Sequence, residues 1–398
     1  MKSYPPNGRT RRRAHAALAS VIIGIALAVS ACTTASPGSP GSSGSSGSGF
    51  LSAAQVATLQ SEVRQAGQVP AFVAPGPAFS TSSVKGKKIF VMPTASQLPV
   101  CNQIANDIVT LGKKFGMSGT NFQNSGGPSG WIPGIQQAIS QHYDAIILVC
   151  GIDPNLIKPQ LQAARAAGIK IIDSGLGDTF VNPTQTSPLV TAQTNVPNGT
   201  MFQRSIDVAL LDNRSKPFDF FEITSNDVPD GIIMDHAFRQ EVAKYCPKCG
   251  VKSVNIAVPD WATKVQSAVT SGILADPKVK AVVPIFDGEV PPAAAGLRAA
   301  GRSDVKLYGD YGGTPAYIAQ MGGGLPMASN VGPTALWRAY ATMDQTLRVL
   351  TGTATVSPDK DGDPSRLWTI SNYKQSAGVN GGCGTAVITG YDKLWGIH

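Results

Sequence analysis

The sequence has few metal-ligating His and Cys side chains, and neither positive nor negative charge is in large excess outside its first residues. It has four His and six Cys residues among 398, and the His residues are scattered. Five of its 33 basic residues lie within the first 13 positions, which leaves 28 basic against 25 acidic residues. No basic cluster occurs in this remainder, so the charge gives no case for binding nucleic acid. No nucleophile motif is present, and Asp227 and Asp230 precede a predicted helix that they can cap, so we expect no enzyme.

Cysteine is sparse, and the one close pair is Cys246 and Cys249. This CxxC spacing fits half of a zinc site or a redox pair, but no second Cys or His pair accompanies it. We predict a local disulfide, with free thiols and a metal or redox role as the alternatives. Residues 359–363 resemble the start of a calcium loop, but Ile370 stands where such a loop needs Glu. We therefore expect no metal and no cofactor. The pairing of the other cysteines of the body stays open: Cys101, Cys150 and Cys383.

The apolar run at residues 16–31 is shorter than the roughly 20 residues that a membrane-spanning helix needs. With the basic start before it and small residues at its end, it predicts a secretory signal over residues 1–31. Val-Ser-Ala-Cys at its end resembles the bacterial lipobox, so we predict lipidation of Cys32, with an ordinary cleaved signal as the alternative. Ser, Gly, Pro and Thr dominate residues 32–50, which predicts a flexible tether. We expect an exported protein, lipid-anchored at the outer face of the cell membrane.

From residue 87 onward, short apolar runs alternate with segments of helical spacing. The first half has predicted strands at residues 89–92, 145–149 and 169–172, and the second half at residues 218–224, 253–258, 281–285 and 305–308. Apolar strands separated by helices of about a dozen residues indicate parallel strands that are covered on both faces. The predicted fold is therefore α/β, with two doubly wound parallel-sheet lobes. A cleft between such lobes is a favoured place for a small-molecule site.

This order of elements, together with the predicted lipobox and tether, resembles the type I periplasmic solute-binding proteins, the ribose-binding-like group. The resemblance covers about residues 85–350, with the best local matches at residues 281–287, 293–301 and 309–315. It implies an extracytoplasmic receptor of an ATP-binding-cassette importer, whose chain crosses between the lobes three times. The implied division gives residues 85–195 and 332–352 to lobe 1, and residues 196–331 and 353–398 to lobe 2.

The resemblance also implies which loops hold the ligand. Thr94 takes the place of a family hydroxyl, and Gln97 is the nearest amide, although both can belong to a plain loop. Trp261 stands where an aromatic residue stacks on the ligand, although it can also be a core residue. Asp287 ends a predicted strand, where a carboxylate accepts hydrogen bonds from ligand donors. The predicted ligand-binding residues are Thr94, Gln97, Trp131, Trp261, Asp287, Asp310, Tyr311 and Asn330.

The sequence departs from the family where sugar binders carry charged residues. An Asp-Arg pair is usual at Gly175 and Leu176, and an Arg is usual at Met234. The usual Asp after the last strand aligns with Tyr311, although neighbouring Asp310 can replace it. We expect a sugar or polyol as ligand, with a nucleoside or aromatic metabolite as the alternative. We also expect a monomer that delivers its ligand to a membrane permease, with a ligand-presenting sensory lipoprotein as the rival role.

Overall fold

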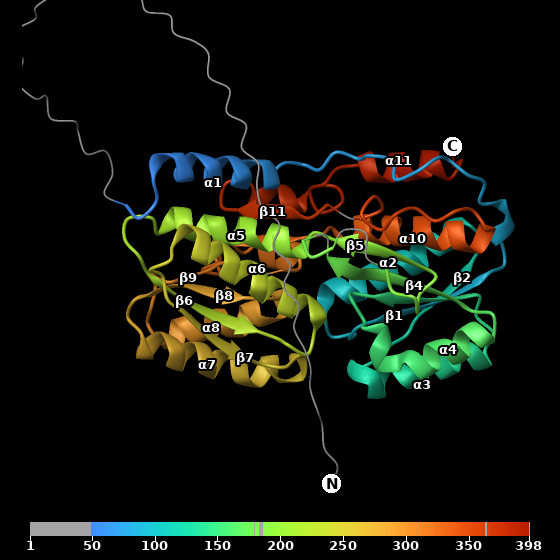
Figure 1. Ribbon diagram of the computed structural model, residues 1–398, viewed down its shortest axis with the longest axis horizontal. Helices are drawn as coiled ribbons and strands as arrows, with labels where there is room; N and C mark the ends of the chain where they lie inside the picture. The colour runs from blue at the N-terminus through green and yellow to red at the C-terminus, as the bar shows by residue number, and fades with distance from the viewer. Residues whose placement is uncertain (1–48, 179, 183–185, 310, 363, 398) are drawn as a thin grey trace, which may run out of the picture. The chain divides into compact units, whose positions relative to one another are not determined.

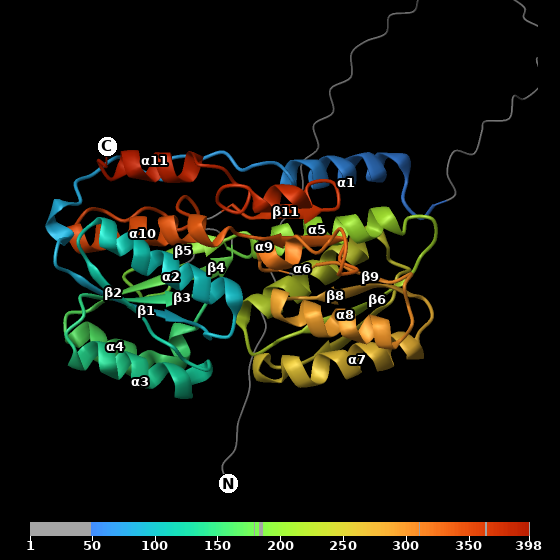
Figure 2. The same cartoon turned by 180° about the vertical axis from the view of Figure 1, so that it is seen from behind.

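The computed structural model of the chain describes residues 49–178, 180–182, 186–309, 311–362 and 364–397. The predicted signal, the predicted lipidation site Cys32 and all but the last two residues of the predicted tether lie outside the described residues, as does Asp310. Contacts join Gly47–His398 into one compact unit. Two sheets stand side by side in this unit, and both views show them (Figures 1 and 2).

The first sheet has five parallel strands in the order β2-β1-β3-β4-β5, and we call the part built on it lobe 1. Its strands are β1 (Lys88–Pro93), β2 (Ser118–Asn121), β3 (Ala145–Val149), β4 (Lys170–Asp178) and β5 (Ala192–Val196). Side chains of a strand alternate between the two faces of a sheet. Ile89 and Val91 of β1 accordingly pack with α2 (Pro99–Lys114) and α10 (Ala335–Thr351). Phe90 and Met92 pack on the other face with α3 (Gly127–Ser140) and α4 (Lys158–Ala166).

The second sheet has four parallel strands in the order β7-β6-β8-β9, and we call the part built on it lobe 2. Its strands are β6 (Asp219–Thr224), β7 (Val251–Asn255), β8 (Val279–Pro284) and β9 (Lys306–Leu307). Phe220 lies in a core with α5 (Asn198–Asp212) and α6 (Pro229–Tyr245). Phe221 lies in the core on the opposite face, with α7 (Trp261–Ala275) and α8 (Val290–Ala299). The predicted fold class, α/β with two parallel-sheet lobes, is confirmed.

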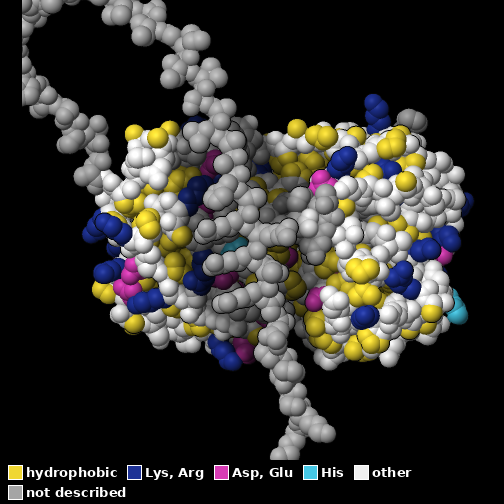
Figure 3. All heavy atoms as spheres, viewed as in Figure 1, with side chains coloured by type: hydrophobic (Ala, Val, Ile, Leu, Met, Phe, Trp, Pro, Cys, Tyr) yellow, Lys and Arg dark blue, Asp and Glu magenta, His cyan; other side chains and the backbone are white. Residues whose placement is uncertain are grey.

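Between residues 192 and 369 the chain passes between the lobes three times. It first leaves β5 for α5, and it returns from β10 (Ser329–Gly332) into α10, which packs on α2, β4 and β5. After α10 it reaches β11 (Arg366–Thr369), which pairs with β10 in an antiparallel manner and lies beside α5. A short helix, α9 (Pro315–Ile318), precedes β10. Lysine and arginine as well as acidic side chains occur on the visible face of both lobes (Figure 3), which agrees with the near balance of charge in the sequence.

The two ends of the described chain lie along one edge of the molecule, where α1 (Ala53–Ala66) and α11 (Ala386–Leu394) appear in both views (Figures 1 and 2). Helix α1 packs on α5 of lobe 2, and the segment after it runs to lobe 1. There the ring of Phe72 lies 5.0 Å from that of Tyr391, and the N–H of Phe79 donates to the carbonyl of Leu394. Residues 67–84, which we call the strap, thus contact both lobes.

The C-terminal helix differs from the expected division of the chain, which placed residues 353–398 in lobe 2. Val387 and Tyr391 of α11, together with Trp395, are buried in the core of lobe 1. The ring of Trp395 stacks on that of Tyr340 of α10, with 5.3 Å between the centroids. The apolar face of α11 therefore covers α10, and only the part of the chain around β11 stays with lobe 2.

Two disulfides are present among the described residues. Cys246 and Cys249, the closely spaced pair, are joined across the turn that follows α6. The second disulfide joins Cys101, in the first turn of α2, to Cys150 directly after β3. Cys383 is buried in the core of lobe 1. Within the described part of the chain, no helix is both long and apolar enough to cross a membrane.

Candidate ligand-binding site

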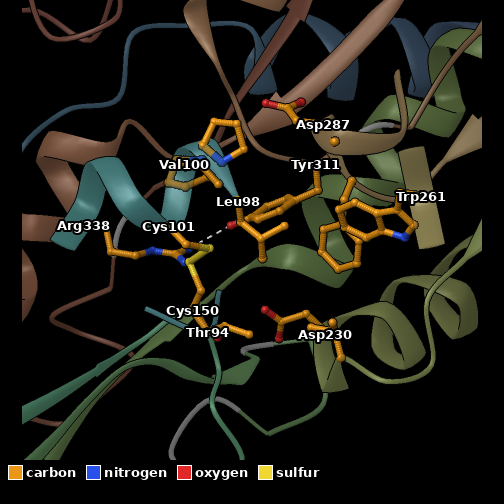
Figure 4. Close-up of a pocket in the computed structure, with 15 residues that line it drawn as sticks. Thr94, Leu98, Val100, Cys101, Cys150, Asp230, Trp261, Asp287, Tyr311 and Arg338 are labelled. Carbon is orange, nitrogen blue, oxygen red and sulfur yellow. Dashed lines mark hydrogen bonds between the residues drawn. A yellow bond between two sulfur atoms is a disulfide. The ribbon is translucent and has the colours of Figure 1, made fainter. Parts of the chain in front are cut away.

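A cavity lies where the two lobes meet. Its walls come from segments that follow the carboxyl ends of strands in both sheets, which is where ligands bind in open α/β sheets. Lobe 1 contributes Thr94, Cys150 and the start of α2, lobe 2 contributes Asp230, Trp261, Phe286, Asp287 and Tyr311, and the crossing into α10 contributes Pro333 and Arg338. Figure 4 shows these groups around one space.

The wall from lobe 1 is apolar. It consists of Leu98, Val100 and the Cys101–Cys150 disulfide, with Thr94 beside them. The hydroxyl of Thr94 lies 2.9 Å from the carbonyl oxygen of Val149 and 2.5 Å from that of Cys150, so its proton is donated to the backbone. This wall therefore offers a ligand hydrocarbon and sulfur surface and few hydrogen-bonding groups.

The wall from lobe 2 carries an aromatic platform. Trp261, in the first turn of α7, stacks on Phe286 with 5.6 Å between the ring centroids and 28° between the planes. The indole N–H donates to Ser225 Oγ at 2.8 Å. The Cα of Gly288 approaches the same ring so closely that an added Cβ would lie 2.7 Å from two of its carbons. The indole is thus fixed on three sides.

A buried carboxyl group holds this platform from behind. Ser225 Oγ lies 2.7 Å from the carbonyl oxygen of Ile256 and 3.0 Å from Oε1 of Glu289, but it has one proton for these two acceptors. Burial raises the pKa of Glu289 to about 8, although hydrogen bonds from Ser225 and two backbone N–H groups favour its ionised form. A protonated Glu289 resolves the shortage, because its O–H donates to Ser225 while Ser225 donates to Ile256. Trp261 then donates to Ser225 Oγ, whose other two hydrogen bonds are both satisfied.

Asp287 presents a carboxylate at the cavity, and neutral donors orient it. The N–H of Thr314 donates to Oδ2, and the amide of Asn330 donates to Oδ1, each at 2.8 Å. Asn330 itself is fully buried and does not line the cavity. Its contribution is therefore to position Asp287, which keeps lone pairs for a ligand donor.

Arg338 supplies a positive charge that the sequence did not predict for this site. It lies in the first turns of α10, it is 2% exposed, and its Nη2 donates to the hydroxyl of Tyr311 at 2.8 Å (Figure 4). Its Nη1 would lie 3.1 Å from a Cβ added to Gly175, where φ is +89°. The guanidinium thus stands against the position where sugar binders carry an Asp-Arg pair. A cation near a helix N-terminus opposes the helix dipole, and this unfavourable placement is the sequence signal that could have found Arg338.

Two further carboxyl groups lie behind or beside the ligand space. Asp230, which we expected only to cap a helix, lies in the first turn of α6 and lines the cavity. Asp173, within β4, is fully buried, and among the described residues neither of its oxygens accepts or donates a hydrogen bond. Burial, followed by the charges of Asp230 and Asp153, raises the pKa of Asp173 well above its usual range. Burial in this place thus favours the neutral form of the Asp173 carboxyl over the ionised form.

The structure brings together part of the predicted set. Thr94, Trp261, Asp287 and Tyr311 line the cavity. Trp131 is buried one layer behind, where its indole N–H donates to the carbonyl of Thr94 at 2.8 Å. Asn330 supports Asp287, and Asp310 lies outside the described residues. Gln97 is exposed, donates to the carbonyl of Ser125 and is not part of the cavity wall.

One group of acidic residues has the spacing of a metal site, but a cation of the protein occupies it. Glu62, Asp207 and Glu241 place a carboxylate oxygen each within 4.8 Å of one another. Arg204 lies among them, with Nη1 3.1 Å from Asp207, Nη2 3.5 Å from Glu241 and a close ion pair to Glu62. The guanidinium takes the place of a metal ion, and it fastens α1 to lobe 2.

The fold and the cleft between its lobes define a two-lobed binding protein, and comparison with known proteins agrees. Residues 89–354 match the family described as periplasmic binding protein domain. A solute-binding protein of an ABC transporter from Mycobacterium smegmatis, with bound glycerol, is 16% identical, with a TM-score of 0.63 over 74% of this chain and 97% of its own. One from Agrobacterium vitis, with bound allitol, is 19% identical, with a TM-score of 0.61 over 73% and 98%. A sugar ABC transporter protein from Yersinia enterocolitica is 18% identical, with a TM-score of 0.65 over 82% and 99%. No curated protein matches the sequence.

The chain belongs to the periplasmic binding protein family, because the match covers well over half of its length. It has the type I fold of this family, as the resemblance in the sequence implied. The family consists of extracytoplasmic solute-binding proteins of transport systems and is not an enzyme class. Helix α1, the strap, β11 and α11 lie outside the matched residues.

Proposed function

We propose that this protein is the lipid-anchored receptor of an ATP-binding-cassette importer and that it captures a sugar or polyol between its lobes. The observation that carries the proposal is the cavity at the carboxyl ends of both sheets, where an aromatic platform, two carboxylates and one guanidinium converge. Aromatic faces suit the C–H surface of a sugar ring, and carboxylates accept hydrogen bonds from hydroxyl groups. The structural neighbours with bound glycerol and allitol support this ligand class.

Closure of the lobes is the step that a permease senses in this proposal. Asp230 of lobe 2 reaches so near lobe 1 that a Cβ on Gly151 would lie 3.4 Å from its Oδ2. A ligand that touches both lobes favours this closed arrangement, and it does so only by its greater affinity for the closed form. The moving bodies are lobe 1 with α10 and α11, and lobe 2 with α1. The receptor acts as a monomer, because each copy holds both walls of its own cavity.

A thermal-shift screen of the chain without its signal tests the ligand class. A ligand at 100 times its Kd stabilises the folded form by about 2.7 kcal/mol, which shifts Tm by several degrees. We expect shifts with sugars or polyols, loss of the shift in Asp287→Ala, and an unchanged shift in Gln97→Ala, whose side chain lies outside the cavity. Shifts with nucleosides or aromatic acids alone would contradict the sugar assignment while keeping the receptor. That alternative has one observation in its favour, which is the apolar wall of lobe 1.

The anchor is tested separately by fractionating cells that express the full chain. We expect the protein in the membrane fraction, and we expect Cys32→Ser to move it to the soluble exported fraction, because the thioether to lipid cannot form. A wild-type protein that is already soluble after export would contradict the lipid anchor and favour an ordinary cleaved signal.

A further inference from the structure

The Cys101–Cys150 disulfide connects two segments of lobe 1 that each contact lobe 2. Leu98, directly before α2, packs against a core of lobe 2. Gly151, directly after Cys150, lies so near lobe 2 that an added Cβ would be 3.4 Å from Oδ2 of Asp230. Cys101 lies in the first turn of α2, and Figure 4 shows its bond to Cys150 at the edge of the cavity. One covalent bond therefore joins the two contacts that lobe 1 makes with lobe 2 beside the ligand space.

The start of α2 lacks the capping that usually fixes such a position. Leu98 is the N-cap residue, and its hydrocarbon side chain accepts no hydrogen bond from the first turn of the helix. No acidic residue in this turn interacts with the helix dipole. The N–H of Leu98 donates to the carbonyl of Ala95 at 3.1 Å, which is a contact within the same loop. The disulfide thus supplies a fixed point on the sheet that helix capping does not provide.

The other end of the disulfide has an unusual backbone conformation. Cys150 has φ of +66°, in the left-handed region that residues other than glycine rarely adopt. Its N–H donates to the carbonyl of Ser174 at 3.0 Å, and its carbonyl accepts from the hydroxyl of Thr94 at 2.5 Å. Such a conformation persists only where the surroundings hold it, and the bond to Cys101 is a third hold. Because Gly151 follows directly, the conformation of Cys150 decides where Gly151 meets lobe 2.

We propose that the Cys101–Cys150 disulfide is a positioning element for ligand binding, which holds Leu98 and Gly151 where lobe 2 meets them in the closed form. This inference rests on the proposed function and adds two positioning residues to the same site. With the disulfide in place, these segments are ordered before the lobes close. A preorganised loop binds more tightly than a mobile one, because binding does not have to order it. Opening the disulfide therefore weakens ligand binding while both lobes stay folded.

Reduction of one disulfide tests this inference. The variant Cys246→Ala/Cys249→Ala leaves the bond between Cys101 and Cys150 as the target within the described chain. Dithiothreitol passes two electrons and two protons to this bond, which gives two thiols and oxidised dithiothreitol. Titration calorimetry with D-ribose, D-glucose, xylitol and ribitol then gives Kd for the oxidised, reduced and reoxidised protein, at a temperature where all three are folded. We expect reduction to raise the Kd of the probe that binds about tenfold or more, and reoxidation to restore it.

An unchanged Kd in a reduced protein of lower Tm would overturn the inference and keep the sugar receptor, because the disulfide would then stabilise the fold alone. The variant Cys101→Ala/Cys150→Gly removes the bond permanently, and its glycine adopts a positive φ without strain. It should bind as weakly as the reduced protein, and binding as tight as in the wild type would equally overturn the inference.

Hydrogen exchange without ligand gives a readout that does not depend on the ligand class. Reduction should speed the exchange of amides at residues 100–104 and 150–152, and it should leave the amides of β2 and β7 unchanged. Equal exchange of the two segments in both forms would overturn the inference. If the oxidised protein binds none of the four probes, the proposed sugar function is overturned, and the exchange rates decide the positioning role by themselves.

Discussion

Glu289 gives a quantitative test of how the aromatic platform is held. Burial raises the pKa of its carboxyl to about 8, from 4.5 in an unfolded chain. Between these values the folded protein keeps a proton that the unfolded chain has lost, so Glu289 favours folding most at low pH. Its contribution is complete below pH 4.5, falls as the pH rises, and is gone once the pH exceeds 8. Linkage gives a slope of roughly 1.4 kcal/mol per pH unit inside this window, or about 2 kcal/mol between pH 6 and pH 8.

The variant Glu289→Gln isolates this contribution. Its amide donates to Ser225 as the protonated carboxyl does, its oxygen accepts from the N–H of Ile285, and it does not titrate. Urea unfolding at pH 6, 7 and 8 measures the free energy of unfolding of both proteins. We expect the difference between variant and wild type to move by about 2 kcal/mol in favour of the variant from pH 6 to pH 8. Burial also raises the pKa of Asp207 to about 8, but Asp207 titrates alike in the two proteins and cancels in the difference.

A difference that stays constant with pH would refute the reasoning. It would mean that Glu289 is ionised in the folded protein at pH 6 and that Ser225 donates to it instead of to Ile256. Trp261 would then donate to the Ser225 hydroxyl, whose own proton would be donated to the Glu289 carboxylate. The position of the indole would therefore depend on a buried charge. The wild-type and variant curves therefore decide between two arrangements of one proton.

Three further changes test other contacts. Gly288→Ala should weaken ligand binding about tenfold, because its Cβ would lie 2.7 Å from two ring carbons of Trp261 and overpacking of this kind costs about 1–3 kcal/mol; calorimetry with an unchanged Kd would contradict it. Arg348→Met should lower the free energy of unfolding by about 3–5 kcal/mol, because it removes the cation 2.6 Å from fully buried Asp344; a loss below about 1 kcal/mol in urea would count against a buried ion pair. Asp173→Asn should stabilise the protein increasingly as the pH rises above 3.8, the ordinary pKa of an Asp, since burial raises the pKa of Asp173 and ionising it costs stability; melting curves with a pH-independent gain would contradict this.

The strands that the sequence predicts best are those whose burial is complete and apolar. β3 reads Ala-Ile-Ile-Leu-Val, and every one of these residues is buried. β5, by contrast, reads Ala-Gln-Thr-Asn-Val and is equally buried. Its polar side chains have tertiary partners, such as the N–H of Gly175 in β4, which donates to Thr194 Oγ1 at 3.2 Å. No local sequence pattern indicates such partners, so β5, which precedes the crossing into α5, was predicted only as a connection between the lobes.

The residues of the candidate site likewise fall into those that could be predicted from the sequence and those that depend on the tertiary fold. Thr94, Trp261 and Asp287 could be predicted from the resemblance to the family, because all three lie in segments that follow strands, and strand ends converge at one edge of a sheet. Arg338 could not be predicted, because it comes close to Gly175 only through the packing of α10 on β4, and the two residues lie far apart in the chain. The wall formed by Cys101 and Cys150 is likewise a product of the fold, since 49 residues separate the two cysteines in the chain.

The strap has a consequence for the order in which the molecule assembles. The carbonyl of Gly67 accepts a hydrogen bond from Arg366, which lies 299 residues further along the chain, and Phe72 packs on Tyr391. Contacts between such distant residues form late, because a long loop must close before they contribute. The N-terminus of a chain is synthesised first, so these contacts of the strap cannot form until the last residues follow, whereas α1 can already pack on α5. Until that moment the strap is exposed to proteases, and its protection from cleavage reports that the whole chain has finished folding.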